Sequence, residues 1–330
     1  MIDWQKRKNY FREKLIVLQS FMKNIIITRE NCGERIDKFI VHEFFSHTRG
    51  YIIRNIKNGT ILLNGKLTKP SHILKENDII EIGTNFKRER LLPNPEVPLD
   101  IIYKDPNIIV INKQAGIQVH PSATEKEFTL ANGLLAKFPE IKNVHDDSPG
   151  AEFRPGIVHR LDKETSGVMV VARNPETFAT LKIIFQNRKA EKKYVALVQG
   201  KMKEKKGLIV KPIARASTYK KQIIATSKTK TKIRPAVTKY KVIATYGNYS
   251  LLEVFPKTGR MHQIRIHLAA IGHPVVGDKI YCPRHLKQSA LKTDRHFLHA
   301  QQIVFRLFGQ KFSFSAPLPE DFSRFLENID

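Results

Sequence analysis

Cysteine and long apolar runs are scarce in this sequence. Its 330 residues include two cysteines, Cys32 and Cys282, which are far apart and have no metal-ligand spacing. So few cysteines in a chain of this length indicate a reducing compartment rather than a disulfide scaffold. No apolar run approaches the roughly 20 residues that a spanning helix needs. The apolar stretch Leu15–Leu18 is also too short for the core of a signal peptide. A cytoplasmic protein is therefore expected.

Acidic residues are also few. The chain has 31 Asp and Glu against 57 Lys and Arg, so its formal net charge is +26. Such an excess favours a polyanionic partner, because each phosphate contact releases condensed counterions. General solubility and binding to an acidic membrane surface are the alternatives. The membrane alternative is the weaker rival, because the basic residues are spread over the whole chain.

The length allows two or three compact domains, and residues 31–83 have the pattern of a small module. An apolar stripe in 34–45 indicates a first helix, and a second stripe beginning at Tyr51 stops at Asn58-Gly59. Short strands are expected on both sides of the tight turn Asn64-Gly65, at 60–63 and at 79–82.

Two segments of different character flank this module. Residues 1–30 form an N-terminal extension, in which the charged stretch 1–23 is compatible with a short amphipathic helix. Residues 84–97 are charged, contain two prolines and have no periodicity, which is typical of a linker.

The remaining residues, 98–330, alternate short β-branched runs with helical patterns. The sequence predicts one α+β domain with a mixed, mostly antiparallel sheet of many short strands. The clearest expected strands are 108–111, 168–171 and 251–254, and the clearest helices are 178–185 and 263–271. Within this domain, residues 201–240 hold 13 Lys and Arg and a single acid, Glu204. These residues indicate either a solvated hairpin with lysines that prevent edge pairing or an arm that follows a phosphate backbone.

The segment 154–174, RPGIVHRLDKETSGVMVVARN, is the most informative part of the chain. Its first residues, Gly156-Ile157-Val158, are expected to enter as a strand. His159, Arg160 and Asp162 then lie in a polar loop before a buried strand, where functional groups are common. The local pattern alone leaves a structural alternative, because an Asp at such a position often caps the backbone of a turn.

A second segment, 255–278, is rich in histidine and arginine. His262, Arg265 and His267 are expected at the start of an amphipathic helix whose apolar side chains face the core. A metal site is a poor explanation, because His262 and His267 are five residues apart and no Cys or Glu completes a ligand set. A surface that faces an anion or RNA suits Arg260, His262 and Arg265 better.

Residues 31–83 also resemble an S4 RNA-binding domain. The matching blocks are Glu34 to Phe39, Ile56 to Gly59, Leu63 to Lys66 and Asn77 to Ile80. Where the family usually has Ser-Arg at the start of its second helix, this chain has Ser46-His47-Thr48-Arg49, so Arg49 is the candidate for the basic role. The RNA-binding residues expected from both domains are Arg35, Lys38, Arg49, Arg54, Lys57, Lys66, His159, Arg260 and His262.

Nearly the whole chain after residue 30 resembles the large-subunit ribosomal RNA pseudouridine synthase D family. The matching blocks are Asp105 to Lys113, Gly156 to Lys163, Lys193 to Val198, Gly259 to His267 and Gly272 to Asp278. The His-Arg-Leu-Asp block followed by Thr-Ser-Gly is highly specific. One departure is Gln114, where the family usually has Pro, and it lies outside these blocks.

The resemblance implies an enzyme that exchanges the C1′–N1 bond of uridine for a C1′–C5 bond, without cofactor or metal. It assigns Asp162 as the catalytic carboxylate, which either attacks C1′ or acts on a sugar intermediate. It gives Arg265 as the counter-ion of that carboxylate, a task that suits a permanently charged guanidinium. Arg160 resembles the residue that holds the target base out of its stack, and Tyr194 resembles the pocket tyrosine that stacks on uracil and helps to remove the C5 proton.

The expected substrate is 23S ribosomal RNA, and no obligate protein partner or membrane is implied. A transfer-RNA pseudouridine synthase of the same fold is the first alternative, although the leading module and the His120-Pro121 context favour ribosomal RNA. A non-catalytic RNA-binding assembly factor is disfavoured because Asp162, Tyr194 and Arg265 are all present. A metal-dependent hydrolase lacks a ligand set.

Overall fold

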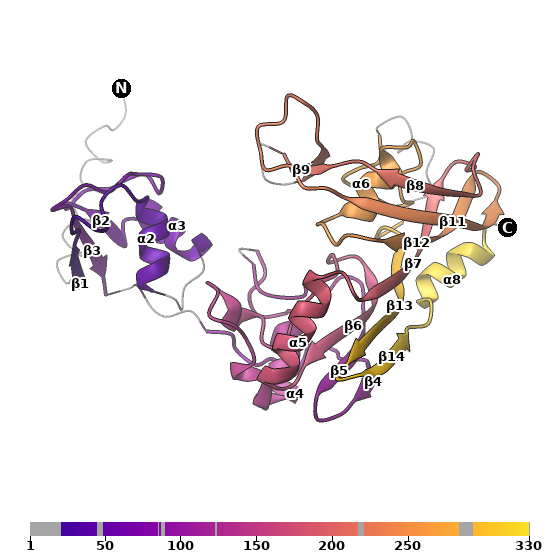
Figure 1. Ribbon diagram of the computed structural model, residues 1–330, viewed down its shortest axis with the longest axis horizontal. Helices are drawn as coiled ribbons and strands as arrows, with labels where there is room; N and C mark the ends of the chain where they lie inside the picture. Colours follow the sequence, from indigo (N-terminus) through magenta and orange to yellow (C-terminus); the bar gives the residue numbers. More distant parts are fainter. Residues whose placement is uncertain are drawn as a thin grey trace, which may run out of the picture. The chain divides into compact units, whose positions relative to one another are not determined.

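The computed structural model describes residues 21–44, 49–84, 86, 90–122, 124–216, 221–283 and 293–329 (Figure 1). Most of the predicted N-terminal helix, residues 1–20, lies outside this range. The chain divides into two compact units, the first comprising Met1–Leu91 with Asp146–Phe153 and the second Leu92–His145 with Arg154–Asp330. The boundary at residues 91 and 92 falls within the predicted linker.

Within its described residues, the first unit contains two helices and a three-stranded antiparallel sheet. The strand order is β1-β3-β2, and the core contains isoleucines from both helices together with Phe86. The elements are β1 (Phe21–Ile26), α2 (Ile36–Glu43), α3 (Arg49–Lys57), β2 (Ile61–Leu63) and β3 (Ile79–Gly83). The predicted order of two helices, a strand, a turn and a strand is confirmed.

Strand β1 was not predicted. It pairs with β3 along the edge opposite β2, so the sheet of this unit begins before residue 31, where the sequence pattern begins the module. The turn at Asn64-Gly65 is confirmed, because both residues have positive φ values of 51° and 71°. Leu63 and Lys66 exchange two backbone hydrogen bonds of 3.0 Å across it.

In the described part of the second unit, nine strands form one large sheet, and β9 and β10 form a separate pair. Its strands are β4 (Ile101–Lys104), β5 (Ile108–Lys113), β6 (Ser166–Ala172), β7 (Glu191–Gln199), β8 (Lys206–Val210), β9 (Ile213–Arg215), β10 (Gln222–Ile224), β11 (Val237–Tyr246), β12 (Tyr249–Pro256), β13 (Leu298–Leu307) and β14 (Gln310–Ser315). Its helices are α4 (Leu130–Lys137), η1 (Pro139–Asn143), α5 (Pro175–Gln186), α6 (Gln263–Ala269) and α8 (Glu320–Glu327), while η2 (Ala151–Phe153) belongs to the segment grouped with the first unit.

The large sheet has the order β4-β5-β6-β13-β7-β12-β11-β8, with β14 paired to β13. Only the pair β6 and β13 is parallel among the described strands, so the predicted mixed and mostly antiparallel sheet is confirmed. The strand predicted at residues 156–158 is wrong. Ile157 makes only an isolated bridge to Val171, which leaves the neighbouring backbone free to form a loop.

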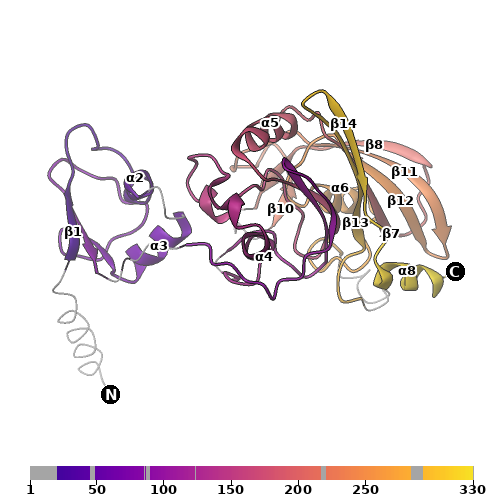
Figure 2. The ribbon, with the colours of Figure 1, turned by 90° about the horizontal axis from the view of Figure 1, so that it is seen from below.

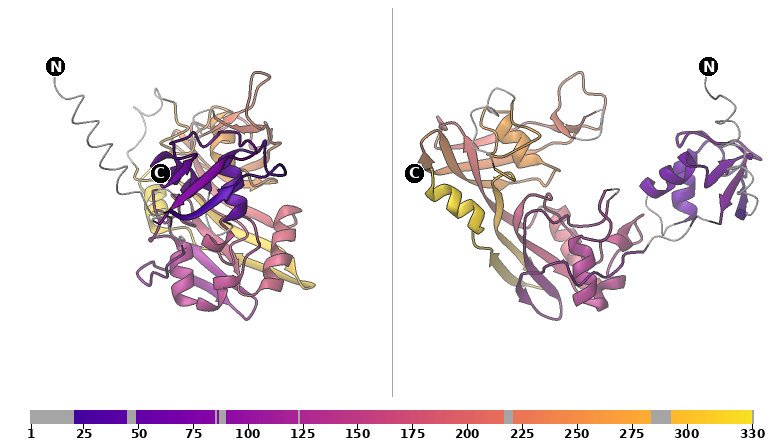
Figure 3. Two further views of the ribbon diagram at one scale, coloured as in Figure 1. Left: turned by 90° about the vertical axis from the view of Figure 1, so that its left-hand side faces the viewer. Right: turned by 180° about the vertical axis from the view of Figure 1, so that it is seen from behind.

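Helices α6 and α8 cover opposite faces of the sheet, because successive side chains of a strand point to opposite sides. On β7, Ala196 and Val198 pack in the same cluster as the apolar side of α6. Their neighbours Val195 and Leu197 pack with Phe322 of α8. Figure 2 shows the two helices on the two sides of the long strands, and Figure 3 shows the same unit from behind.

The predicted amphipathic helix exists as α6, but its pattern was misjudged. All six residues from Gln263 to Leu268 are buried, so the helix has no exposed polar face in this stretch. Its polar side chains are buried because each has a partner. For example, His267 lies 2.9 Å from the Thr238 hydroxyl through Nδ1 and donates from Nε2 to the Lys211 carbonyl at 2.9 Å.

The basic region 201–240 contains an edge strand of the large sheet and a separate strand pair. Strand β8 is an edge of the large sheet and carries exposed lysine. The pair β9 and β10 is separate from that sheet and packs beside α6. None of the described helices is long and apolar enough to cross a membrane.

Candidate active site

Asp162 lies in the loop that leads into β6. Leu161, which is buried, anchors the loop. The Thr165 amide donates to the Asp162 carbonyl at 3.1 Å, and this backbone hydrogen bond closes a turn. The Asp162 carboxylate is not used for that turn. Among the described residues its hydrogen-bond donor is the side chain of Arg265, at 3.0 Å. The structural alternative, a carboxylate that caps the backbone, is therefore not what is observed.

Lys113 holds the far side of this loop. Its ammonium group is buried and donates to the carbonyl oxygens of Gln114, Ile117 and Lys163 at 2.7, 2.8 and 3.0 Å. Lys163 follows Asp162 directly, so the lysine fixes the backbone next to the carboxylate. A buried donor with three acceptors is costly to remove, because each carbonyl would lose its partner.

Two buried histidines on β13 and just before it hold the other end of the loop. His296 contacts the Thr165 hydroxyl at 2.7 Å, and His299 contacts the Ser166 hydroxyl at 2.9 Å. Burial lowers the pKa of His296 to about 3, so this ring is neutral at physiological pH. The parallel pairing of β6 and β13 requires Gly167, because a Cβ there would lie 2.2 Å from the Ala300 carbonyl oxygen.

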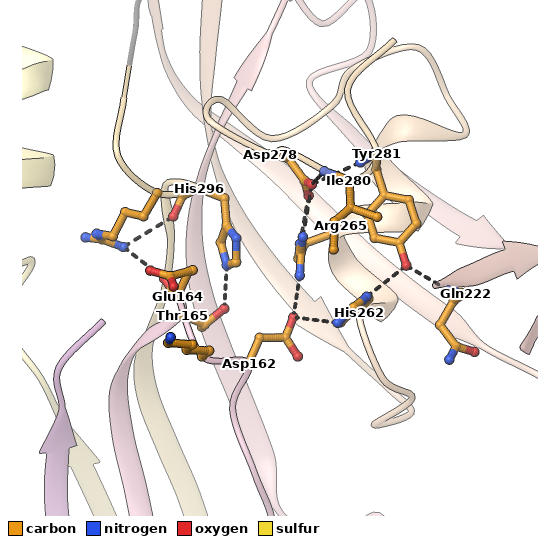
Figure 4. Close-up of polar contacts among 12 residues, drawn as sticks. Asp162, Glu164, Thr165, Gln222, His262, Arg265, Asp278, Ile280, Tyr281 and His296 are labelled. Carbon is orange, nitrogen blue, oxygen red and sulfur yellow. Dashed lines mark hydrogen bonds and ion pairs between the residues drawn. The ribbon is translucent and has the colours of Figure 1, made fainter. Parts of the chain in front are cut away.

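Arg265 is the centre of a chain of three charges (Figure 4). It is 4% exposed, and its Nε and Nη2 donate to the two carboxylate oxygens of Asp278 at 2.7 and 2.9 Å. Its third nitrogen, Nη1, donates to Oδ2 of Asp162. The guanidinium is thus fixed bidentately by one carboxylate and directs its remaining edge at the other.

Asp278 is oriented by its own turn. Gly277 before it has a φ of 79°, and a Cβ at that position would lie 2.0 Å from the Arg295 carbonyl oxygen. The backbone amides of Ile280 and Tyr281 then donate to Asp278 Oδ1 at 2.8 and 3.0 Å. This carboxylate therefore has four donors, and its place is set by backbone as well as by Arg265.

The electrostatics of the buried pair favour the charged forms of Asp278 and Arg265. Burial opposes the charged form of Asp278, but the hydrogen bonds and charge of Arg265 hold its pKa below the ordinary value. Burial likewise acts to lower the pKa of Arg265, and the carboxylates of Asp278 and Asp162 raise it above its usual range. The formal charges of these three side chains, two carboxylates and one guanidinium, sum to −1.

His262 lies beside the same carboxylate, in the left-handed conformation with a φ of 55°, immediately before α6. Its Nε2 is 3.9 Å from Asp162 Oδ2, and its Nδ1 is 2.8 Å from the Tyr281 hydroxyl. Burial lowers the pKa of His262. The structure thus brings His262, expected on an RNA-facing surface, into the carboxylate site.

Tyr194 belongs to another element, strand β7, whereas Arg160 belongs to the same loop as Asp162. Tyr194 is half-buried on β7, and burial together with the charge of Asp162 raises the pKa of its phenol. Arg160 is exposed, and its Nη1 donates to Nε2 of His120 at 3.2 Å. An arginine can only donate, so His120 is the acceptor and is neutral, and burial lowers its pKa to about 4.

His159 has the environment of a structural residue. Its ring stacks on Phe185 at 4.3 Å with an interplanar angle of 13°, and its Nε2 accepts a hydrogen bond from the Val170 amide at 3.0 Å. Burial lowers the pKa of His159 to about 3. A neutral ring held in this way does not fit the cationic, RNA-binding role expected from the sequence, because it offers no charge to a phosphate.

The other expected RNA-binding residues divide into two groups. Arg260 donates to the Pro235 carbonyl at 3.3 Å beside α6. The remaining six lie in the first unit, where Lys38, Lys57 and Lys66 are exposed and Arg54 lies 5.9 Å from the ring of Tyr51. Arg35 and Arg49 both bind the buried Asp37, at 3.0 and 2.8 Å.

Several residues of the site were missed by sequence reasoning. Asp278, Tyr281 and Lys113 are held against the carboxylate or its loop, although nothing in their local patterns marks them as partners of Asp162. Asp278 and Lys113 do fall within blocks that resemble the synthase family, which is the signal that was available. In the described part of the chain, no three His, Cys, Asp or Glu residues are grouped so as to hold a metal ion.

Comparisons with known proteins agree with this geometry. The family model described as RNA pseudouridylate synthase matches residues 107–270, and the S4 domain model matches residues 34–80. An uncharacterized RNA pseudouridine synthase of Aquifex aeolicus is 41% identical over 252 residues, which are 75% of this chain and 77% of that protein. The ribosomal large subunit pseudouridine synthase D of Haemophilus influenzae is 34% identical over 312 residues, 91% of this chain and 92% of that protein.

A solved structure supports the same assignment. Human RNA Pseudouridylate Synthase Domain Containing 1 aligns with a TM-score of 0.56 and 25% sequence identity, covering 72% of this chain and 96% of that chain. The fold, the two matched domains and these relatives agree, and the chain belongs to the RNA pseudouridine synthase family, the enzymes that isomerise uridine in RNA.

Proposed function

We propose that this enzyme forms pseudouridine in 23S ribosomal RNA, in the cytoplasm, with Asp162 as the catalytic carboxylate. The observation that carries the assignment of Asp162 is its hydrogen bond to Arg265, which Asp278 holds in turn. The choice of substrate rests on the similarity, over 91% of the chain, to a relative named for the large ribosomal subunit. The leading S4 domain also favours ribosomal RNA over transfer RNA.

The reaction breaks the C1′–N1 bond, forms the C1′–C5 bond, removes the proton from C5 and places one on N1. Atoms and electrons balance without a redox partner. The carboxylate acts at C1′, either by direct attack or by stabilising a sugar intermediate. Arg265 and His262 both lie on the Oδ2 side of Asp162, so Oδ1 is the oxygen offered to the ribose.

We propose that Tyr194 stacks on the uracil and that Arg160 occupies the position in the RNA stack that the flipped base leaves. A raised pKa keeps the Tyr194 hydroxyl protonated, which favours stacking on uracil over direct removal of the C5 proton. Arg160 is exposed next to Asp162, so its planar cation can occupy the space that a flipped base leaves. The transfer-RNA alternative shares all of these residues and is distinguished by substrate alone.

The test is the Asp162→Asn variant, assayed on 23S ribosomal RNA transcripts and on transfer RNA. We expect no measurable pseudouridine in the variant and an RNA Kd within about threefold of wild type, because most affinity comes from phosphate contacts elsewhere. Asp100→Asn is the matched control, since this exposed carboxylate accepts from Asn112 away from the site. Turnover by Asp162→Asn within about tenfold of wild type would refute the assignment, and activity on transfer RNA alone would refute the proposed substrate.

A further inference from the structure

A basic arm runs beside the carboxylate site. We define it as residues 211–216 and 221–234, which contain seven Lys and Arg and no acid. Strands β9 and β10 belong to it, and its apolar residues Ile213 and Ile224 pack in one small cluster with Ile266 of α6 and Tyr281. The arm is therefore fixed to the helix that carries Arg265.

One hydroxyl group joins this arm to the site (Figure 4). The backbone amide of Gln222, the first residue of β10, donates to the Tyr281 hydroxyl oxygen at 3.0 Å. The same oxygen is 2.8 Å from His262 Nδ1. The Tyr281 ring also lies 5.3 Å from the guanidinium carbon of Arg265, so the tyrosine contacts the arm, the histidine and the arginine.

The direction of these hydrogen bonds is set by the carboxylate. A neutral imidazole has one N–H and one acceptor nitrogen. Its Nε2 faces the negative Asp162 Oδ2 at 3.9 Å, so the tautomer with hydrogen on Nε2 is favoured and the opposite one would direct a lone pair at the carboxylate. Nδ1 then accepts from Tyr281, whose oxygen accepts from Gln222. Donors thus point in sequence from the arm to the carboxylate.

We propose that Tyr281 and His262 are positioning residues that couple the basic arm to the orientation of Asp162. The inference rests on the proposed function, since it assumes that Asp162 is the reacting carboxylate. When β10 is held in place by RNA bound along the arm, the Gln222 amide fixes the Tyr281 hydroxyl, and Tyr281 holds the His262 ring in the tautomer that Asp162 favours. The Nε2 hydrogen then keeps Oδ2 turned toward Arg265. RNA binding along the arm would then also orient Asp162 Oδ1 toward the ribose.

Tyr281→Phe tests this coupling, because it removes the hydroxyl and keeps the ring beside Arg265. We expect kcat on a 23S ribosomal RNA transcript to fall about five- to tenfold, the effect of one lost hydrogen bond, with the RNA Kd within about twofold of wild type. Tyr103→Phe is the matched control, since the Tyr103 hydroxyl also donates one side-chain hydrogen bond, in its case to the Asp105 carboxylate at 3.0 Å. Its kcat should stay within about twofold.

A double-mutant cycle separates positioning from a general structural effect. His262→Asn suits the left-handed backbone at this residue but removes the group that faces Asp162. Tyr281→Phe should therefore cost nothing further in kcat in the His262→Asn background. His262→Gln, whose amide can reach the place of Nε2, should retain more activity than His262→Asn. Additive effects in the cycle, or a weaker Kd with unchanged kcat, would overturn the proposal.

Amide hydrogen exchange provides a readout that does not depend on turnover. The Gln222 amide should exchange faster in Tyr281→Phe, because it has lost its acceptor. RNA binding should slow that exchange more in wild type than in the variant, and equal slowing would contradict the coupling. If Asp162→Asn keeps its activity, the proposed function fails. If Asp162→Asn is inactive and the cycle is additive, only the coupling fails.

Discussion

Replacing Asp278 with Asn should both destabilise the catalytic unit and inactivate the enzyme. The change keeps the size and the acceptor for the backbone amides but removes the charge that fixes Arg265 through two hydrogen bonds of 2.7 and 2.9 Å. Both side chains are buried, so the pair is screened little by solvent. Breaking a buried ion pair from one side costs about 3–5 kcal/mol. In a unit of this size that corresponds to a fall in Tm of about 6–20 °C.

The effect of Asp278→Asn on Tm should also depend on pH in a defined direction. The pKa of Asp278 is lowered in the folded protein, so its stabilising effect is fully present above the ordinary Asp pKa of about 4. It is lost as the pH falls through the lower, folded-state pKa. The Tm difference between wild type and Asp278→Asn should therefore be constant near neutral pH and shrink below about pH 4. Calorimetry across this pH range measures it.

Asp321→Asn is the matched control. Arg295 binds Asp321 bidentately, at 2.5 and 2.8 Å, but the Asp321 side chain is 52% exposed. Exposed pairs contribute about 0–1 kcal/mol, so the Tm of Asp321→Asn should fall by less than about 4 °C.

The activity of Asp278→Asn is measured at a temperature where this variant is still folded. Its kcat should be at least about tenfold below wild type, since Arg265 is no longer held against Asp162. Equal Tm losses in the two variants, or full activity in folded Asp278→Asn, would refute this reasoning.

Two further changes probe the support of the Asp162 loop and the S4 domain. Lys113→Met should lower the free energy of unfolding by about 3 kcal/mol, because three carbonyls lose a buried donor, whereas the exposed Lys104→Met should change it by less than about 0.5 kcal/mol in urea titrations. Removing residues 1–90 takes away 18 basic and 10 acidic side chains, a net charge of +8. RNA affinity should then be weaker with a shallower salt slope and retained chemistry at saturating RNA, and unchanged affinity would contradict a binding role for the S4 domain.

The strands and helices with strong local patterns were predictable, and the exceptions have physical causes. Strand β1 was missed because it follows a charged stretch, and its place in the sheet depends on pairing with β3, far along the chain. Helix α6 was expected to expose its polar residues. Periodicity records only which side chains are apolar, and it cannot record that Gln263, Arg265 and His267 each find a buried partner.

The site itself was identified through a resemblance and not through local patterns. Asp162 and Arg265 are 103 residues apart in the sequence, and only the order of strands in the folded sheet brings their loops together. Local reasoning left a turn-capping carboxylate open as an alternative for this reason. His159 is the converse case. Its position next to Arg160 suggested a cation, whereas burial keeps its ring neutral and the ring stacks on Phe185.

The distribution of charge explains how a strongly basic protein can hold an anionic centre. The whole chain carries a net charge of +26, and its cations lie on exposed elements such as α3, β8 and the basic arm, where they attract phosphates. At the centre of the site, Asp162, Arg265 and Asp278 sum to −1, and His262 beside them is neutral. A phosphate is repelled from that centre, whereas the ribose of a flipped uridine is neutral and becomes positive at C1′ as its bond to N1 breaks. Because the phosphates carry the same charge throughout, a negative centre would act in the proposed reaction as a preorganised charge that stabilises the positive charge developing at C1′.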